Sequence, residues 1–558
     1  MPTNKYHKDP FYKSGTPWIW LNAGAVTISV IMVVGLLALI AVRGLGHFWP
    51  KTVYEIEYLD NKVTIQIIGE RVETEEVLKQ RILESGIAVE SDDELIERSL
   101  IKVGNRDFLG VDFMLTVEPN ELQVDKPKDV LVLERTQWGN FYGYLQQIKN
   151  NGEVLNLDEP TKWQELASRL ERVDDLRDRI EHIEKVEIGR INYQLEKLRL
   201  KKRGLELDES TDEEKFQAIE DKRAEFNADY EVLKSELDAL YREMSRDSVT
   251  AKIMNGKEVE IMLANIVKAY RPNAMSLGEK IIFYIKTFWG FITDDPREAN
   301  TEGGIFPAIF GTVLTVMLMS VVVMPFGVIA AIYLREYAKQ GFLTRLVRIS
   351  VNNLAGVPSI VYGVFGLGFF VYVVGGTIDE LFYSAALPAP TFGSGGLLWA
   401  SLTLALLTVP VVIVATEEGL SRIPRSIREG SLALGATKAE TLWRMILPMT
   451  SPAIMTGLIL SIARAAGEVA PLMLVGVVKL APSLPLDGNA PFVHLDRKFM
   501  HLGFHIYDVG FQSPNVEAAR PLVYATALIL VLVIIILNLA AIYTRNHLRE
   551  KYKDLEQN

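Results

Sequence analysis

Arg464 and Glu468 stand four positions apart within a run that is otherwise free of charge. We expect both side chains on one helix face, one turn apart and near the middle of a membrane span. A charged side chain at that depth costs about 3 kcal/mol even on the membrane-insertion scales that give the lowest values. Such residues therefore seldom persist without a partner or an aqueous path. The forked donors of an arginine match an oxyanion, and a carboxylate can accept the proton that phosphate carries and sulfate lacks. The residues alone leave two hypotheses open: a structural ion pair, or a transit point for an anion.

Uncharged polar residues in another apolar run are weaker candidates for the same path. Asn352, Asn353 and Ser359 lie in the run of residues 349–374, where a glycine and a proline permit a kink or a close helix approach. Side chains of this kind contribute to helix packing more often than to a pathway, so both interpretations are kept.

Motifs for catalysis are missing from the sequence. There is no G-x-x-x-x-G-K-[ST] phosphate loop, so we expect no ATP hydrolysis by this chain and no catalytic residues in it. The few histidines do not cluster with glutamates as a metal site would, and we expect surface or packing roles for His494, His501 and His505. No metal or cofactor is assigned to this chain, so any catalysis would have to come from a partner.

The composition indicates a membrane protein with a large water-exposed part. Of the 558 residues, 49% are hydrophobic and 23% are charged, and the mean hydropathy is +0.15. Six runs reach the roughly 20 apolar residues that a transmembrane helix needs. They span residues 18–42, 303–334, 349–374, 397–416, 455–478 and 521–544. The first run exceeds a typical signal-peptide core and lacks a clear cleavage site, which favours a membrane anchor over a signal sequence.

Lysine and arginine residues in the short loops predict the orientation of these helices. The basic segments fall on one side if six helices alternate; they are residues 1–17, 335–348, 417–450 and 545–558. We expect that side to be the cytoplasm of a bacterial cell. Both termini, including the tail at 549–558, then lie inside, and residues 43–301 lie in the periplasm with a net charge of roughly −15. The chain contains no cysteine, so this exported segment must be stable without disulfides.

The external segment is predicted to form an α+β domain. A β-rich platform is expected over residues 51–150 and 250–270, because short stretches alternate apolar and polar residues. These strand signals lie at residues 53–59 and 62–68 around Asp60-Asn61, at 111–117, at 129–133, and in a hairpin at 251–262.

A change of period predicts a helical arm between the two parts of the platform. Over residues 161–247, apolar residues recur at steps of mostly three and four amid alternating charge, with an acidic turn at 204–214. We expect an antiparallel coiled-coil hairpin whose ends lie close together on one β domain. Residues 279–293 are aromatic and too short to span a membrane, which favours an interfacial helix that leads back to the bilayer.

A polar insert at residues 417–448 separates the fourth and fifth runs. A helix-forming stretch is followed by Gly435, which permits a turn that a Cβ would oppose. We expect a short helix across the membrane axis, in a loop of residues 417–450. Such a helix fits a groove in a soluble partner and transmits the partner's movement to the spans that it joins. The residues assigned to this coupling are Glu418, Glu429, Gly430, Ser431, Gly435, Ala436, Leu447 and Pro448. An ordinary basic loop is the alternative, because a glutamate and a glycine at this spacing are common.

Three further segments carry a resemblance to a known family. They are PFG at 325–327 with AIYLREY at 331–337, LAGVPSIVYG at 354–363, and ARAAGEVAPL at 463–472. Together with the insert, which resembles the cytoplasmic EAA loop of ABC-importer permeases, they resemble the PstA-type permease subunit of the phosphate ABC importer. This subunit type falls in the binding-protein-dependent transport system inner membrane component family. The resemblance covers the first span and a permease core at about 303–548, but not residues 53–298, which far exceed the family's short connection.

The resemblance implies a fold and a function. The fold is a multi-pass α-helical membrane protein with six transmembrane helices and a type I ABC-importer core, to which the large extracytoplasmic α+β domain is added. The function is import of inorganic phosphate across the cytoplasmic (inner) membrane by alternating access, with ATP and Mg²⁺ bound by a separate ATPase. Implied partners are a second homologous permease subunit, two ATPase subunits, a periplasmic phosphate-binding protein and the lipid bilayer. A phosphate-sensing regulator is a further candidate, and nucleic acid is not expected.

Two other functions stay open. A permease for another oxyanion would share the insert, because only the region of Arg464 and Glu468 bears on the substrate. A membrane signalling or scaffold protein would use the acidic arm and keep an inactive permease-like core. The arm itself either only enlarges the protein or contacts a binding protein, the partner permease or a sensor.

Overall fold

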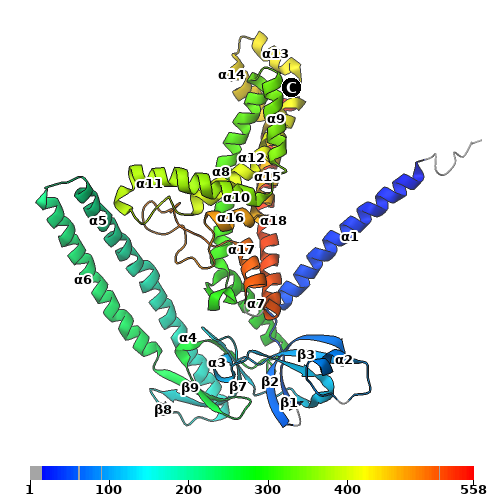
Figure 1. Ribbon diagram of the computed structural model, residues 1–558, viewed down its shortest axis with the longest axis vertical. Coiled ribbons are helices and arrows are strands. Elements are labelled where there is room, and N and C mark those ends of the chain that lie inside the picture. Colours follow the sequence, from blue (N-terminus) through cyan, green and yellow to red (C-terminus); the bar gives the residue numbers. More distant parts are fainter. Residues whose placement is uncertain (1–14, 61–62, 90, 514–515, 558) are drawn as a thin grey trace, which may run out of the picture.

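The computed structural model describes residues 15–60, 63–89, 91–513 and 516–557. Figure 1 shows a bundle of long helices with β-sheets at one end and the short helices α13 and α14 at the other. A helical hairpin extends from the sheets along the side of the bundle. The predictions for residues 1–14 and for the turn residue Asn61 lie outside the described residues.

Within the described residues, six helices are long and apolar enough to cross a membrane, as the uncharged runs predict. Short π-helical segments lie within several of them and divide each into shorter elements. The candidate spans are α1 (Thr16–Gly46); α8 (Phe306–Ile332) with η5 (Tyr333–Tyr337); α10 (Ser359–Phe365), η6 (Gly366–Gly375) and α11 (Gly376–Phe382); α12 (Leu397–Arg422); α14 (Lys438–Thr441), η8 (Leu442–Ile446) and α15 (Leu447–Gly467); and Ala519–His547 within α18 (Val516–Gln557).

The third candidate span begins later than predicted. Residues 349–354 belong instead to a separate helix, α9 (Phe342–Leu354), and the span runs over Ser359–Phe382. Pro358 explains the break, because the residue before a proline avoids the helical conformation and the proline has no N–H to donate.

The fifth candidate span is displaced toward the N-terminus, from the predicted 455–478 to Lys438–Gly467. It starts at Thr437, whose hydroxyl accepts from the Glu440 N–H while the Glu440 carboxylate accepts from the Thr437 N–H. It ends after Gly467, because the ring of Pro471 in a continued helix would clash with the carbonyl of the residue four positions before it.

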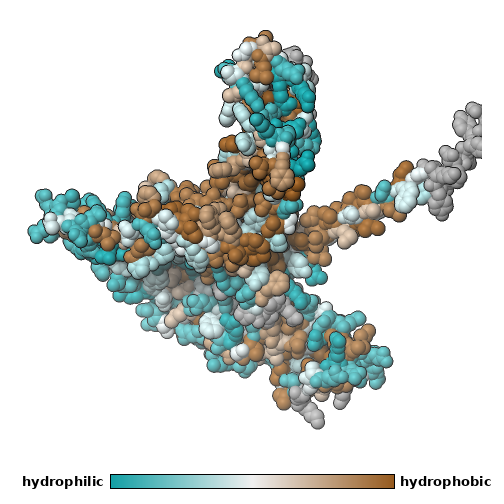
Figure 2. All heavy atoms as spheres, turned by 45° about the horizontal axis from the view of Figure 1, so that its top comes forward, coloured by the Kyte–Doolittle hydropathy of each residue, from teal (hydrophilic) through white to brown (hydrophobic). Residues whose placement is uncertain are grey.

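The spans pack side by side around an apolar core. α12 lies between α8 and α15, α15 packs on α18, and α1 packs on α18. Fully buried leucines of α12, including Leu404 and Leu407, lie at the centre of this core. Figure 2 shows apolar side chains over the bundle and α1, and hydrophilic side chains at the α13–α14 end and on the hairpin. This segregation is what a helical bundle in a bilayer requires.

The polar domain between α1 and α8 contains two packed sheets where the sequence predicts one platform. The first sheet has the order β4-β3-β2-β1-β5, and the second has the order β10-β9-β7-β6-β11 with β8 beside β7; all the pairs are antiparallel. Its strands are β1 (Val53–Asp60), β2 (Val63–Leu78), β3 (Leu95–Lys102), β4 (Phe113–Val117), β5 (Glu121–Asp125), β6 (Leu131–Arg135), β7 (Phe141–Asn150), β8 (Glu153–Val154), β9 (Asp247–Lys252), β10 (Glu258–Met262) and β11 (Ile266–Tyr270). Short helices between the strands are α2 (Lys79–Glu84) and α3 (Arg106–Leu109).

The helical hairpin is inserted between β8 and β9. Its first leg is α4 (Glu159–His182), η2 (Ile183–Ile188) and α5 (Gly189–Leu207), and its second leg is α6 (Glu213–Met244). Ile180 and Ile183 pack against Leu237 and Leu240 in a seam between the legs. The β7–β9 pair brings Asn150 opposite Asp247, so both ends of the insertion leave from one place in the second sheet.

A buried carboxylate joins the root of the hairpin to the sheet. Asp247 is fully buried and accepts hydrogen bonds from Arg169 at 2.6 Å, from Arg172 at 2.8 Å and from Arg246 at 2.9 Å. Burial by itself raises the pKa of Asp247, but the arginines outweigh it and hold the pKa below its usual value.

The free part of the hairpin lies against the bundle. The Tyr193 hydroxyl of α5 donates to the carbonyl of Ala490, and its ring lies 6.0 Å from that of His494. Lys185 pairs with Asp295, in the linker between α7 (Leu277–Thr293) and α8. The linker also holds the short pair β12 (Pro296–Arg297) and β13 (Glu302–Gly303).

Helix α7 has two apolar faces with different surroundings. The rings of Tyr284, Phe288 and Phe291 pack around Phe48 at the end of α1. Trp289 and Ile285 on the other face are 66% and 59% exposed. An exposed aromatic and aliphatic face beside the end of a membrane span is typical of an interfacial helix.

We expect Asp247→Asn to destabilise the polar domain by about 3 kcal/mol, because three arginines lose the charge that compensates them. Hydrogen exchange of the purified full chain should show faster exchange in α4, α6 and β9, with the bundle unchanged. Glu258→Asn, at an exposed position in β10, is the control. Unchanged exchange at the root of the hairpin would contradict the assigned role of Asp247.

Candidate substrate path and coupling insert

Arg464 and Glu468 form an ion pair at the C-terminal end of a helix. Helix α15 ends at Gly467, and Glu468 has extended backbone angles of φ −81° and ψ 134°. The Arg464 Nε nevertheless lies 3.6 Å from the Glu468 Oε1, with the two side chains 31% and 20% exposed. The two residues therefore pair across one helical turn as expected, but the pair lies at the end of the span and not near its middle, because the helix already starts at Lys438 and Glu468 caps it.

A second interrupted helix flanks this end of α15. Tyr362 of α10 lies within electrostatic reach of Arg464, and its hydroxyl donates to the Leu354 carbonyl at 2.7 Å across the α9–α10 break. A Cβ on the neighbouring Gly363 would lie 2.7 Å from the Cα of Pro471, so α10 packs directly on α16 (Ala470–Val475). Sequence reasoning did not single out Tyr362, although a buried tyrosine in an apolar span needs a hydrogen-bond partner.

Two of the three uncharged candidates lie outside the third candidate span, and Ser359 lies at its start. Asn352 and Asn353 are exposed on α9, before the candidate span begins, and Ser359 is the first residue of α10. In the described part of the chain, none of the three forms a hydrogen bond to Arg464 or Glu468. Tyr362 is the residue of this region that connects the α9–α10 break with the neighbourhood of Arg464.

The polar insert folds into two short helices with a turn between them. Helix α13 (Arg425–Ala433) is followed by Gly435 at φ 89°, where a side chain would be strained, and the chain turns into α14. Glu418 lies in the last turn of α12 and pairs with Arg422 at 2.5 Å. Leu447 and Pro448 lie within the fifth candidate span and not in the predicted loop, because that helix already runs from Lys438.

Ion pairs fasten the insert to the other helices at this end of the bundle. Arg428 of α13 pairs with Glu336 at 3.0 Å and donates to the carbonyls of Leu420 at 2.7 Å and Ile423 at 3.1 Å. Arg348 of α9 pairs with Glu417 at 3.2 Å. Sequence spacing gave no indication of the Arg428–Glu336 and Arg348–Glu417 pairs, because their members are far apart along the chain.

The outer side of the insert is apolar and exposed. Leu434 is 90% exposed, Trp443 is 73% exposed and Leu432 is 48% exposed. Glu429 and Gly430 are also exposed, Ala436 is half-buried, and the Ser431 hydroxyl lies 2.9 Å from that of Thr441. Such a patch on an otherwise polar end is a candidate contact surface for another protein.

Comparison with known proteins connects this arrangement to a family. A family model described as binding-protein-dependent transport system inner membrane component matches residues 323–551. The phosphate transport system permease protein PstA 1 of Mycobacterium tuberculosis is 34% identical over 247 residues, which cover 44% of this chain and 71% of that protein. PstA of Yersinia pestis is 34% identical over 255 residues, which cover 45% and 74%. The chain belongs to the PstA-type permease family.

This membership establishes the chain as a permease component of an ABC importer and a multi-pass protein of the inner membrane. The matched residues begin in α8 and end in α18, so the two sheets and the hairpin lie outside the family model. A solved structure of the MetNI methionine ABC transporter also matches, with 19% identity and a TM-score of 0.31, over 44% of this chain and 94% of that chain.

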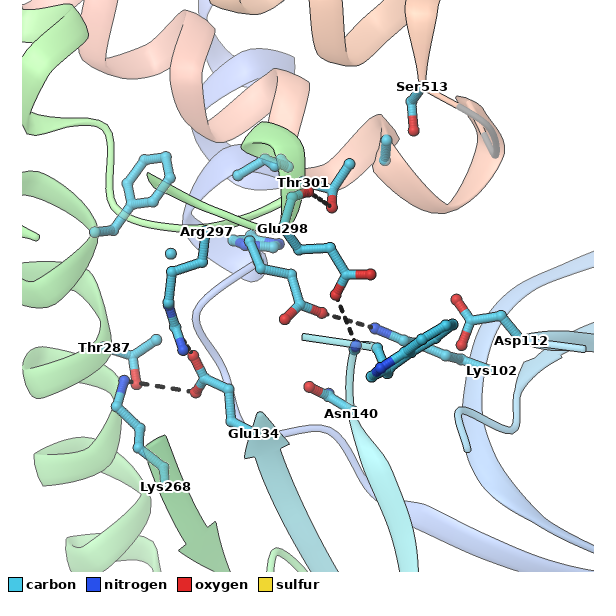
Figure 3. Close-up of a pocket in the computed structure, with 18 of the residues that line it drawn as sticks. Lys102, Asp112, Glu134, Asn140, Lys268, Thr287, Arg297, Glu298, Thr301 and Ser513 are labelled. Atoms are coloured by element: carbon cyan, nitrogen blue, oxygen red, sulfur yellow. Dashed lines mark hydrogen bonds and ion pairs between the residues drawn. The ribbon is translucent and has the colours of Figure 1, made fainter. Parts of the chain in front are cut away.

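The permease has a second polar feature at the opposite end of the bundle. A cavity of about 500 Å³ lies between the first sheet, the second sheet, the α7–α8 linker, the end of α1 and the start of α18. Figure 3 shows Lys268 and Arg297 reaching Glu134 from two elements, with Lys102 and Asp112 on the opposite side. The Lys268 Nζ lies 3.7 Å from Glu134, and the Lys102 Nζ lies 3.9 Å from Glu302.

Glu302, four residues before α8, is the titrating group of this cavity. Burial raises its pKa from 4.5 to about 7; the charge of Lys102 opposes the rise, Glu134 and Glu298 add to it, and Arg297 opposes it. A carboxyl whose pKa is higher in the folded state binds its proton more tightly there than in the unfolded chain. Its stabilising contribution is therefore complete below pH 4.5 and is lost as the pH rises through about 7.

We expect the α7–α8 linker to open more readily as the pH rises from about 6 to about 8. The predicted change is ~1.4 kcal/mol, or roughly tenfold in the opening equilibrium. Hydrogen exchange of peptides covering residues 294–306, corrected for the intrinsic pH dependence of exchange, measures it. Glu302→Gln should remove the change and Glu258→Gln should keep it. An equal change in the wild type and Glu302→Gln would contradict the role of Glu302.

Proposed function

We propose that this permease is the transmembrane subunit of an ATP-driven importer that moves inorganic phosphate across the cytoplasmic membrane by alternating access. The observation that carries the proposal is the Arg464–Glu468 pair at the broken end of α15, in a chain related to proteins named as phosphate transport permeases. The coupled ATPase is a separate chain that engages residues 417–448.

The pair is suited to a transient oxyanion. Its separation of 3.6 Å exceeds the roughly 2.7–2.9 Å of a tight charge-assisted hydrogen bond, so little has to be broken when an anion enters. Two phosphate oxygens accept hydrogen bonds from the guanidinium of Arg464. The carboxylate of Glu468 accepts a hydrogen bond from the proton of monohydrogen phosphate. When the path is empty, the carboxylate neutralises the guanidinium.

The same pair supports the proposed subunit composition. Both side chains are partly exposed in the single chain, which leaves one side of the path open. A second homologous permease subunit closes it, two ATPase subunits bind ATP and Mg²⁺, and a periplasmic phosphate-binding protein delivers the substrate. A phosphate-sensing regulator is a further proposed partner.

The proposed orientation follows from the two ends of the bundle. Helices α13 and α14 lie at the end opposite the sheets (Figure 1), so an insert in the cytoplasm leaves residues 43–301 in the periplasm. Both termini are then cytoplasmic. The exposed leucines and Trp443 of the insert face the ATPase in this arrangement.

We expect Arg464→Lys to lower phosphate uptake even though it keeps the charge, because lysine lacks the paired N–H donors of a guanidinium. A loss of about 2 kcal/mol is expected, or roughly 30-fold in kcat/KM. ATP-dependent uptake of radiolabelled phosphate by proteoliposomes containing the assembled importer measures it, and Arg545→Lys near the end of the sixth candidate span is the control. Normal uptake would remove Arg464 from the path, and preferred transport of sulfate would identify a permease for another oxyanion.

Leu434→Asp should separate the ATPase from the permease without unfolding the permease. Leu434 is 90% exposed, so the substitution disturbs no packing within the chain, but it places a charge in the proposed contact. Co-purification in mild detergent should fall about tenfold or more. Val232→Asp, at a 65% exposed position in α6, should leave it unchanged. Full recovery of the ATPase with the Leu434 variant would contradict the proposed coupling surface and would favour a scaffold protein.

A further inference from the structure

The cavity between the sheets and the bundle lies at the level where membrane spans end. Candidate spans end at Gly46 and begin at Phe306 and Ala519, and residues close to each of these positions line the cavity or its immediate surroundings. The interfacial helix α7 contributes Thr287, Gly290 and Phe291 to its wall. The cavity therefore opens where lipid headgroups meet the protein.

The walls of the cavity are of two kinds. Phe48, Phe291, Ala519 and Leu522, from the helices, form an apolar wall. The sheets and the α7–α8 linker form a charged wall (Figure 3). An occupant with a charged part and an adjoining apolar part fits both, whereas a soluble ion or a cluster of water molecules would leave the apolar wall without a partner.

The charged wall carries equal numbers of basic and acidic residues. Its lining residues include five lysines and arginines and five aspartates and glutamates. The histidine at the cavity, His47, has its pKa lowered to about 4, chiefly by burial, and is uncharged at neutral pH. An occupant without net charge is therefore favoured over an anionic or a cationic one.

Several buried polar atoms in this wall lack a hydrogen-bond partner. The Arg297 Nη1 and the Thr287 hydroxyl can donate, and the Asp112 Oδ1 and the Glu302 Oε2 can accept. Buried atoms of this kind are rare in folded proteins and need an occupant that both accepts and donates. A phosphate group accepts from the first two, and an ammonium group with N–H bonds donates to the last two.

We propose that this cavity binds the headgroup of a zwitterionic phospholipid with a primary ammonium, that is, phosphatidylethanolamine. Its phosphodiester lies toward Arg297 and Thr287, its ammonium toward Glu302 and Asp112, and its glycerol and acyl chains along Phe291 and Leu522. Phosphatidylcholine is disfavoured because its quaternary ammonium has no N–H to donate. Phosphatidylglycerol is disfavoured because it adds a negative charge and offers no cation to the carboxylates.

The bound lipid joins parts that are otherwise connected by ion pairs. Glu302 and Arg297 belong to the linker that leads into α8, whereas Asp112 directly precedes β4 of the first sheet and Thr287 belongs to α7. A headgroup that bonds to all of them fixes the polar domain to the start of a membrane span. Lipid composition then affects the stability of this junction without any change at Arg464.

Lipid exchange into the purified full chain tests the proposal. The protein is incorporated into nanodiscs of equal parts phosphatidylethanolamine, phosphatidylcholine and phosphatidylglycerol at about pH 8, where Glu302 is ionised. It is then stripped with mild detergent, and the retained lipids are quantified by mass spectrometry. Phosphatidylethanolamine should be enriched over phosphatidylcholine about tenfold, the effect of one hydrogen bond between charged groups.

Two variants and a control make the test specific. Glu302→Gln should abolish the enrichment, and Thr287→Val, which removes a donor but keeps the shape, should reduce it. Glu258→Gln, on exposed β10, should retain it. If Glu302→Gln fails to fold, Thr287→Val alone tests the site.

Other results would overturn the proposal. Equal retention of the three lipids, or enrichment that persists in both cavity variants, would show that the cavity holds no such headgroup. Enrichment of phosphatidylglycerol would identify an anion site instead. If soluble phosphoethanolamine raised the thermal stability of delipidated protein as much as phosphatidylethanolamine does, the ligand would be a soluble one.

Discussion

Prolines set the ends of two membrane helices of this permease, and the candidate substrate path lies where these ends meet. A proline has no backbone N–H, and its ring opposes the helix that precedes it. Pro358 separates α9 from α10, and Pro471 ends α15 at Gly467. Helix α10, which follows the first break, packs on α16, which follows the second. They touch at Gly363, where a Cβ would lie 2.7 Å from the Cα of Pro471. Arg464, in the last turn of α15, pairs there with Glu468, the residue that caps the same helix.

The helix that ends at this junction starts in the polar insert at the other end of the bundle. From Lys438 to Gly467 it runs for 30 residues, or about 45 Å at ~1.5 Å per residue. Its first turn is fixed by the Thr437–Glu440 capping box, and the insert is fastened by the Arg428–Glu336 and Arg348–Glu417 pairs. One helix therefore connects the insert with the region of Arg464, as the proposed coupling to a separate ATPase requires.

The large polar domain is attached to the bundle at more than one place. The chain enters it from α1 and leaves it through the α7–α8 linker, and the charged cavity lies between these connections. The hairpin makes a further contact through Tyr193 and the carbonyl of Ala490. The domain is therefore joined to the bundle through several separate contacts and not through a single linker. Contacts of Asn300 with the Lys479 carbonyl at 2.8 Å add to this connection.

The sequence by itself determined the number of apolar helices long enough to cross a membrane within the described residues, the presence of a polar insert, and the helical period of the arm. These are local properties, because hydropathy and periodicity are carried by neighbouring residues. It also contained the cause of both helix breaks, Pro358 and Pro471, although uncharged runs alone misplaced the third and fifth spans.

Only the tertiary structure decided which distant groups meet. The pairs Arg428–Glu336 and Lys102–Glu302, the electrostatic interaction of Tyr362 with Arg464, and the bonds of Arg169 and Arg172 to Asp247 join residues that no spacing rule relates. Asn352 and Asn353 were assigned to the path from composition, but the break at Pro358 places them on α9. Long-range contacts arise from the packing of whole elements, so their partners are set by the fold and not by the local pattern of residues.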